Sequence, residues 1–141
     1  MRSKSVKVDL SYPVLYENVF HSPRINDIGL YYLSRRFGDN ETLLYIGKTS
    51  SSFYNRLLSH KEWFEQYKGK RLVRLGIIVQ PKNYDDGLIA DIESALIHEM
   101  QPFENTDKKN WYSFYNMCEI TNTGYRGLLP TTIFMKDHIR K

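Results

Sequence analysis

The sequence is nearly free of cysteine, since Cys118 is the only one among 141 residues. A single thiol cannot form a disulfide within the chain, which favours a reducing compartment. The sequence also lacks any apolar run close to the roughly 20 residues that a membrane-spanning helix needs. Its N-terminus shows no cationic segment followed by an apolar one, the pattern of a secretory signal peptide. We therefore expect a soluble, cytoplasmic protein that does not act at a membrane.

Several patterns typical of particular classes are absent as well. There is no internal repeat, no zinc-finger spacing, no helix-turn-helix pattern and no long basic tail. Lys and Arg number 20 against 16 Asp and Glu, so the net charge is +4, which is compatible with a polyanionic partner without requiring one. Aromatic residues make up 14% of the chain, with 11 Tyr. The length fits one domain, taken here as residues 1–141.

A hairpin of two short strands is predicted in the first half of the chain. Residues 29–37 and 42–49 are rich in aromatic and aliphatic side chains, as strands are. The segment 38–40 between them reads Gly-Asp-Asn, which is a turn signal. Such a short connection favours antiparallel pairing of the two strands.

Two tyrosines lie on these strands at positions where they can point the same way. Because alternate residues of a strand share a face, Tyr31 and Leu33 should lie together on the first strand. By the same rule, Leu43, Tyr45 and Gly47 should share one face of the second strand. Edge-to-face packing is the plain alternative to a chemical role for the tyrosine pair.

The segment after the hairpin shows helix and strand signals in turn. Serines 50–52 can cap a helix over 53–67, with a glycine as its stop. A strand is expected over 71–80, closed by Pro81. A second helix should start at Asp85 or Asp86 and run to Met100, before a proline.

The fold predicted from these signals is α/β. It consists of a small three-stranded mixed sheet (β-hairpin, helix, strand, helix) flanked by helices. Its core spans about 29–105, with extensions 1–28 and 106–141. In the extensions, 5–10 alternates as an edge strand would, 111–119 reads as a short helix, and the rest of the tail is loop-like.

Short motifs on these elements follow one another in a suggestive order. They are Gly29-Leu30-Tyr31, Tyr45-Ile46-Gly47, Arg56 with His60, Glu93, and Asn105. This ordered set resembles the GIY-YIG nuclease family over residues 29–105. Leu30 replaces the commonest residue of the first motif, which is a conservative change.

Glu93 stands out without any family comparison. On the second helix, Ile89, Ile92, Leu96 and Met100 form an apolar stripe at helical spacing, and Glu93 falls inside it. A carboxylate buried there needs compensation. A bound cation and an Arg partner are the two candidates. The resemblance implies the first, and a lone carboxylate with waters and substrate phosphates suits Mg²⁺, with Mn²⁺ as a substitute.

The other candidates have alternatives of their own. Arg56 and His60 are one helical turn apart and share a face. Arg56 could hold a phosphate bidentately or form a structural ion pair, and His60 could be an ordinary core histidine. Lys48 could favour a phenolate at a nearby tyrosine or simply be exposed at a strand end. Asn105 could orient Glu93 or a metal-bound water, or be a turn residue.

The resemblance implies metal-dependent endonucleolytic hydrolysis of phosphodiester bonds in DNA, with RNA not excluded. It implies one metal, a tyrosine (Tyr31 or Tyr45) as general base, and products with a 3′ hydroxyl and a 5′ phosphate. The main alternative is a module of the same fold that binds nucleic acid but is catalytically silent or needs a partner. Family members serve as restriction enzymes, mobile-element endonucleases and repair nucleases.

A basic and aromatic segment after the core is a second candidate for nucleic-acid contact. Lys108, Lys109 and Trp111 could touch backbone and bases, although such a segment is more often the amphipathic start of a helix. The sequence leaves open a monomer or a homodimer, the latter favoured if the target is palindromic.

Overall fold

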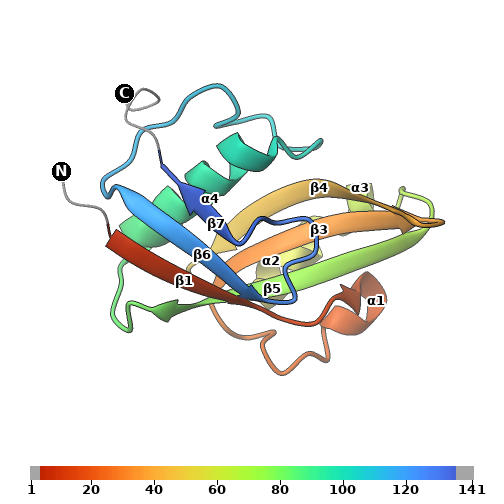
Figure 1. Ribbon diagram of the computed structural model, residues 1–141. Helices are drawn as coiled ribbons and strands as arrows, with labels where there is room; N and C mark the ends of the chain where they lie inside the picture. The colour runs from red at the N-terminus through yellow and green to blue at the C-terminus, as the bar shows by residue number, and fades with distance from the viewer. Residues whose placement is uncertain (1–3, 136–141) are drawn as a thin grey trace.

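The computed structural model of the chain describes residues 4–135 (Figure 1). Within that range it contains seven strands and four helices. The strands are β1 (Lys4–Leu10), β2 (Val14–Leu15), β3 (Gly29–Phe37), β4 (Asn40–Thr49), β5 (Lys70–Gln80), β6 (Cys118–Gly124) and β7 (Thr132–Phe134). The helices are α1 (Tyr16–Val19), α2 (Phe53–Ser59), α3 (Lys61–Phe64) and α4 (Asp86–Met100).

The sheet is mixed and strongly curled into a half-barrel, in the order β4-β3-β5-β1-β6-β7, with β2 paired to β5. The predicted α/β sheet of three strands flanked by extensions is therefore wrong. Segments of both predicted extensions belong to the sheet. β1 lies between β5, to which it is antiparallel, and β6, to which it is parallel, so the expected edge strand is an interior one.

The sheet separates two apolar clusters. On the concave face α4 contacts β3, β4, β6 and β7 (Figure 1), and its apolar stripe packs on side chains such as Leu30, Ile46 and Ile120. On the other face the first three helices cover a cluster that includes Tyr31, Phe53 and Phe64. Burial of these side chains on both faces explains why β3 is apolar along most of its length.

The expected boundaries of α4 are confirmed. The Asp85 carboxylate accepts from Leu88 N at 2.9 Å and caps the first turn, and Gln101 ends the helix in the left-handed region at φ 51°. Glu93 is buried within the stripe, as the periodicity predicts. None of the described helices is long and apolar enough to cross a membrane.

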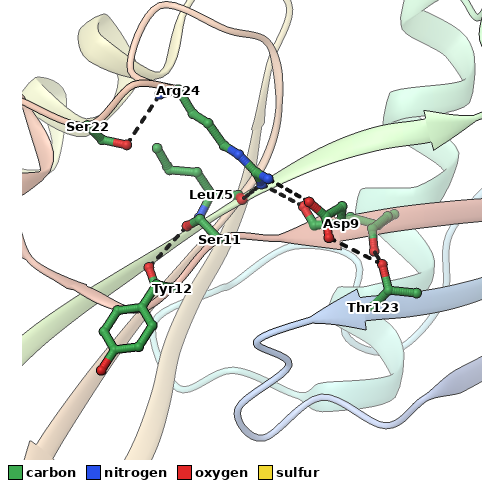
Figure 2. Close-up of polar contacts among 8 residues, drawn as sticks. Asp9, Ser11, Tyr12, Ser22, Arg24, Leu75 and Thr123 are labelled. Atoms are coloured by element: carbon green, nitrogen blue, oxygen red, sulfur yellow. Dashed lines mark hydrogen bonds and ion pairs between the residues drawn. The ribbon is translucent and has the colours of Figure 1, made fainter.

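An arginine ties the N-terminal segment to the sheet (Figure 2). Arg24 Nη1 donates to the carbonyls of Asp9 (2.9 Å) and Leu75 (3.0 Å), and its guanidinium pairs with the Asp9 carboxylate. On the other side of β1, Thr123 Oγ1 donates to the Val8 carbonyl at 3.1 Å. The two extensions are thus held to the core by side chains as well as by strand pairing.

The helix expected over 111–119 is not present. The backbone N–H groups of Tyr115 and Asn116 donate to the buried carboxylate of Asp91 at 3.0 and 2.8 Å. Those bonds replace the i to i−4 bonds of a helix, and β6 begins at Cys118. The predicted loop-like tail is also wrong, since it contains most of β6 and all of β7.

Candidate active site

The candidate residues gather around β4, the edge strand of the sheet. β4 is the last of the described strands at this side of the sheet. Side chains of α2 pack with β4 residues on one face, and α4 contacts β4 on the other. Tyr31 comes from β3, Tyr45 and Lys48 from β4, Arg56 from α2 and Glu93 from α4. His60 lies between α2 and α3.

A β-bulge determines the face of β4 on which Tyr45 lies. Leu33 pairs with Tyr45 while the next residue, Ser34, pairs with Leu43, so Leu44 is an extra residue on β4. The Tyr31 and Tyr45 rings lie on the same face, stacked with centroids 6.1 Å apart. The expectation that Leu43 shares this face is wrong, because the bulge shifts the alternation and Leu43 packs in the concave cluster.

Two glycines of the motifs have steric reasons to be glycine. The Tyr31 ring lies directly over Gly47, where a Cβ would stand 2.2 Å from Tyr31 Cζ. A Cβ on Gly29 would stand 2.1 Å from the Gly76 carbonyl oxygen, and Gly29 also has φ +147°. Any side chain at position 47 would therefore push Tyr31 from its place.

His60 contacts both Tyr31 and a residue that the sequence analysis did not single out, Trp63. Its Nε2 lies 2.8 Å from Tyr31 Oη, and Trp63 Nε1 donates to its Nδ1 at 3.0 Å. The single helix expected over 53–67 is wrong. It breaks at His60 into α2 and α3, and the break places the imidazole against Tyr31.

Burial dominates the electrostatics of this cluster. It raises the pKa of Tyr31, as does the neighbouring Tyr45, while Arg56 lowers it. Burial and then Glu93 raise the pKa of Tyr45, whereas Arg56 and Lys108 lower it. Burial and the Arg56 charge lower the pKa of His60 to about 4, so its imidazole is neutral at neutral pH.

An open cavity of about 350 Å³ lies beside the aromatic cluster. Its walls are charged or polar and comprise Lys48, Thr49, Ser50, Ser51, Arg56, Glu93 and Lys108. Three cations and one carboxylate around a single small space match the needs of a phosphate group together with a hydrated cation. The predicted Lys48 and Arg56 thus line the same space as Glu93.

A lysine compensates the negative charge of Glu93. From the sequence, a bound cation and an arginine were the two candidates. Lys108 Nζ donates to Glu93 Oε1 at 2.7 Å. Lys108 itself has a positive φ of 66°, unusual for a residue with a side chain. Lys108 lies on the loop after α4, and from there its ammonium contacts the buried Glu93 carboxylate.

The donor set fits one kind of metal site only. Across residues 4–135, no three His, Cys, Asp or Glu side chains are grouped so as to hold a metal ion. A single buried carboxylate facing an open cavity fits Mg²⁺, which keeps most of its waters and takes further ligands from substrate phosphates. Glu93 is the residue that would hold it, with Lys108 as the competing cation.

Asn105 acts on the strand rather than on Glu93. Its Oδ1 accepts from Ile46 N at 2.9 Å, and its Nδ2 donates to Ile46 O at 3.0 Å. The side-chain amide thus takes the place of a further strand at the β4 edge, between Tyr45 and Gly47. This satisfies two buried backbone groups and fixes the position of the tyrosine beside them.

Replacing Asn105 with alanine should destabilise the fold by about 2–4 kcal/mol, because it leaves the Ile46 N–H and carbonyl without those partners. Urea unfolding of the variant measures this loss. The exposed Asn110 provides the matched control, since its change to alanine should cost less than about 0.5 kcal/mol. Equal stability of the two variants would contradict the role given to the Asn105 amide.

The basic and aromatic segment lies next to the cavity. Lys108, Lys109 and Trp111 line a cleft of about 400 Å³ between this segment and α4, and Lys108 lines the cavity as well. Lys109 Nζ donates to the Pro102 carbonyl at 2.8 Å, and Trp111 is 53% exposed. The cleft and the cavity are therefore neighbours on either side of one lysine side chain.

No family model, curated protein or solved structure matches this chain. The geometry around β4 is therefore what supports a function. Sequence reasoning missed Trp63 and the pairing of Lys108 with Glu93. The first had a signal, an indole three residues after His60, whereas the second depends on the path of a loop.

Proposed function

We propose that the chain is a metal-dependent endonuclease of the GIY-YIG type that hydrolyses phosphodiester bonds in DNA. The observation that carries the proposal is the grouping of Tyr31, Tyr45 and His60 around Arg56, which lines one open cavity together with Glu93. The reaction needs three groups: a guanidinium, a buried carboxylate, and a phenol that is hydrogen-bonded to a neutral imidazole.

The phosphate would be held by the cations of the cavity. The Arg56 guanidinium has the planar fork that binds two phosphate oxygens at once, and its charge offsets the charge that develops on them as water attacks. Lys48 adds a second positive charge on the same wall. Hydrolysis by in-line attack leaves a 5′ phosphate and a 3′ hydroxyl.

A tyrosine serves as general base. A phenol ordinarily titrates near 10, and burial raises the pKa of both candidates further. Two cations near Tyr45, Arg56 and Lys108, lower its pKa and so oppose the effect of burial. The reaction rate should accordingly increase with pH between 7 and 9, because the phenolate fraction increases.

Glu93 would hold the divalent cation, whose chemistry is to stabilise negative charge on the leaving 3′ oxygen. For Glu93 to do so, the Lys108 ammonium must leave Oε1. Lys108 is then free to bind a phosphate oxygen at the rim, between the cavity and the cleft. Nucleic acid would extend along that cleft, with Lys109 and Trp111 as further contacts.

Incubation of the purified protein with supercoiled plasmid and Mg²⁺, with and without a chelator, tests the proposal. We expect nicking or linearisation with Mg²⁺ and none with the chelator. An RNA of the same sequence as a linear DNA substrate distinguishes the two nucleic acids. Absence of cleavage at every pH from 7 to 9 would reject the hydrolase.

A silent binding module is the second candidate, and one observation favours it. The Lys108 ammonium already neutralises Glu93, so the carboxylate is satisfied without a metal. Such a module would retain DNA in a mobility-shift assay equally with Mg²⁺ or chelator, and would never cut it. The same plasmid incubation therefore separates the two candidates.

A further inference from the structure

The two ring nitrogens of His60 have partners that determine where its proton lies. Trp63 Nε1 is 3.0 Å from Nδ1, and an indole N–H can only donate. Nδ1 must therefore be the acceptor and carry no proton. In a neutral imidazole the proton is then on Nε2, which lies 2.8 Å from Tyr31 Oη.

This assignment gives the Tyr31 hydroxyl a direction. His60 Nε2–H donates to Tyr31 Oη, and the Arg56 charge lowers the pKa of the same hydroxyl. Because His60 supplies a donor, the Tyr31 proton must point away from it. Tyr45 is the other polar ring beside Tyr31, stacked on it with centroids 6.1 Å apart. Trp63 donates to His60 and His60 donates to Tyr31, so the two bonds run in one direction.

We propose that Trp63 is a positioning residue that holds His60 in the Nε2–H tautomer, and so orients a hydrogen-bond chain from Trp63 through His60 to Tyr31, whose ring stacks on Tyr45. Its catalytic consequence rests on the proposed function. Tyr45, which is partly exposed and stacked on Tyr31, is the general base, and Tyr31 stabilises it.

The proton count of the step is simple. Tyr45 enters as the phenolate, having lost its proton to solvent, and the Tyr31 O–H donates to that oxygen. As the water oxygen bonds to phosphorus, one water proton passes to Tyr45 and the bond to the 3′ oxygen breaks. Tyr45 returns the proton to solvent after the products leave, and Tyr31 and His60 keep their own protons throughout.

The two tyrosines differ in their exposure to solvent. Tyr31 is fully buried beneath Tyr45, whereas Tyr45 is only partly buried. Charged groups face the pair from α2 (Arg56), from α4 (Glu93) and from the loop after α4 (Lys108). Solvent can therefore reach Tyr45 but not Tyr31.

The opposite tautomer, and the imidazolium, would both place Nδ1–H against the Trp63 N–H, two donors with no acceptor between them. The low pKa of His60, about 4, agrees with exclusion of the charged form. A phenylalanine at position 63 keeps an aromatic ring but removes the N–H donor. The Nδ1–H tautomer and the imidazolium are then no longer excluded.

Long-range ¹H–¹⁵N NMR of the His60 ring tests the tautomer without DNA or metal. In the wild-type protein we expect the Nε2–H form alone, unchanged from pH 5.5 to 9. In Trp63→Phe we expect a mixture of tautomers and a titration that shifts towards 6.5. Trp111→Phe, the control at the other tryptophan, should give the wild-type His60 spectrum.

Kinetics test the catalytic consequence. Tyr45→Phe should abolish the increase of kcat with pH, while Tyr31→Phe should lower kcat but keep that increase. Trp63→Phe should lower kcat about tenfold, the equivalent of one hydrogen bond.

A protonated Nδ1 in the wild type, or one unchanged tautomer in Trp63→Phe, overturns the positioning role even if no DNA is cut. An increase of kcat with pH that persists in Tyr45→Phe overturns the assignment of the base.

Discussion

Gly47→Ala should reduce DNA cleavage at least 100-fold while the protein still folds. The new Cβ would stand 2.2 Å from Tyr31 Cζ and 2.3 Å from Tyr31 Oη, so the ring must move. Tyr31 would then lose its hydrogen bond to His60, and a misplacement of about 1 Å in such a site can cost two orders of magnitude. Overpacking should also cost about 1–3 kcal/mol of stability. Single-turnover cleavage and urea unfolding measure the two effects.

Gly87→Ala is the matched control for that substitution. Gly87 lies in the first turn of α4, where the nearest atom to an added Cβ is Asp85 Oδ1 at 3.3 Å. Alanine is favoured over glycine in a helix, so stability should stay level or increase by up to about 1 kcal/mol. Full cleavage activity in Gly47→Ala would show that the position of Tyr31 does not matter to the reaction.

Glu93→Gln should lower cleavage about 10³-fold in saturating Mg²⁺, since several kcal/mol of charge stabilisation depend on a cation at this carboxylate. The amide keeps the shape of the side chain but loses its charge. Lys108 loses its counter-ion at the same time. Binding of Mn²⁺, followed by electron paramagnetic resonance, should weaken in parallel with the rate.

Glu99→Gln is the control on the same helix, because Glu99 is exposed on α4 and does not line the cavity. It should retain wild-type cleavage and wild-type Mn²⁺ binding. Undiminished cleavage by Glu93→Gln in Mg²⁺ would remove Glu93 from the metal site and leave its ion pair with Lys108 as a structural one.

Local signals were enough to predict the centre of the fold. The aromatic strand from Gly29 to Phe37, the turn after it and the strand ending at Gln80 are read from short stretches of sequence. The capping carboxylate of Asp85 and the stripe around Glu93 likewise depend on residues within a few helical turns. The ordered motifs lie on these elements, which is why the sequence could place the candidate residues on them.

The rest of the sheet depends on contacts between distant segments. Val8 pairs with Asn122 in parallel strands, and no local pattern states that a strand near one end will lie beside a strand near the other. Residues 118–119 therefore read as the end of a short helix, and 120–124 as part of a loop-like tail. A strand at 5–10 could be predicted, but not that both of its edges would be occupied.

Within the site, small departures from regular geometry were the unpredictable part. The bulge at Leu44 moves Leu43 to the opposite face from Tyr45, and the break at His60 ends a helix that the pattern continues. Lys108 adopts a positive φ and its ammonium lies on Glu93. Each of these depends on tertiary packing rather than on residue preference.

The most direct test of the central claim compares the wild-type protein with Arg56→Ala, purified in parallel, on one end-labelled DNA in Mg²⁺. Arg56 lines the cavity and interacts with Tyr31, so its loss removes the group that holds the phosphate oxygens. We predict that the wild type yields fragments with 5′ phosphate and 3′ hydroxyl ends, and that Arg56→Ala is slower by about 10²–10³-fold. Equal cleavage by the two proteins, or none by the wild type, would contradict the claim that this cluster hydrolyses DNA.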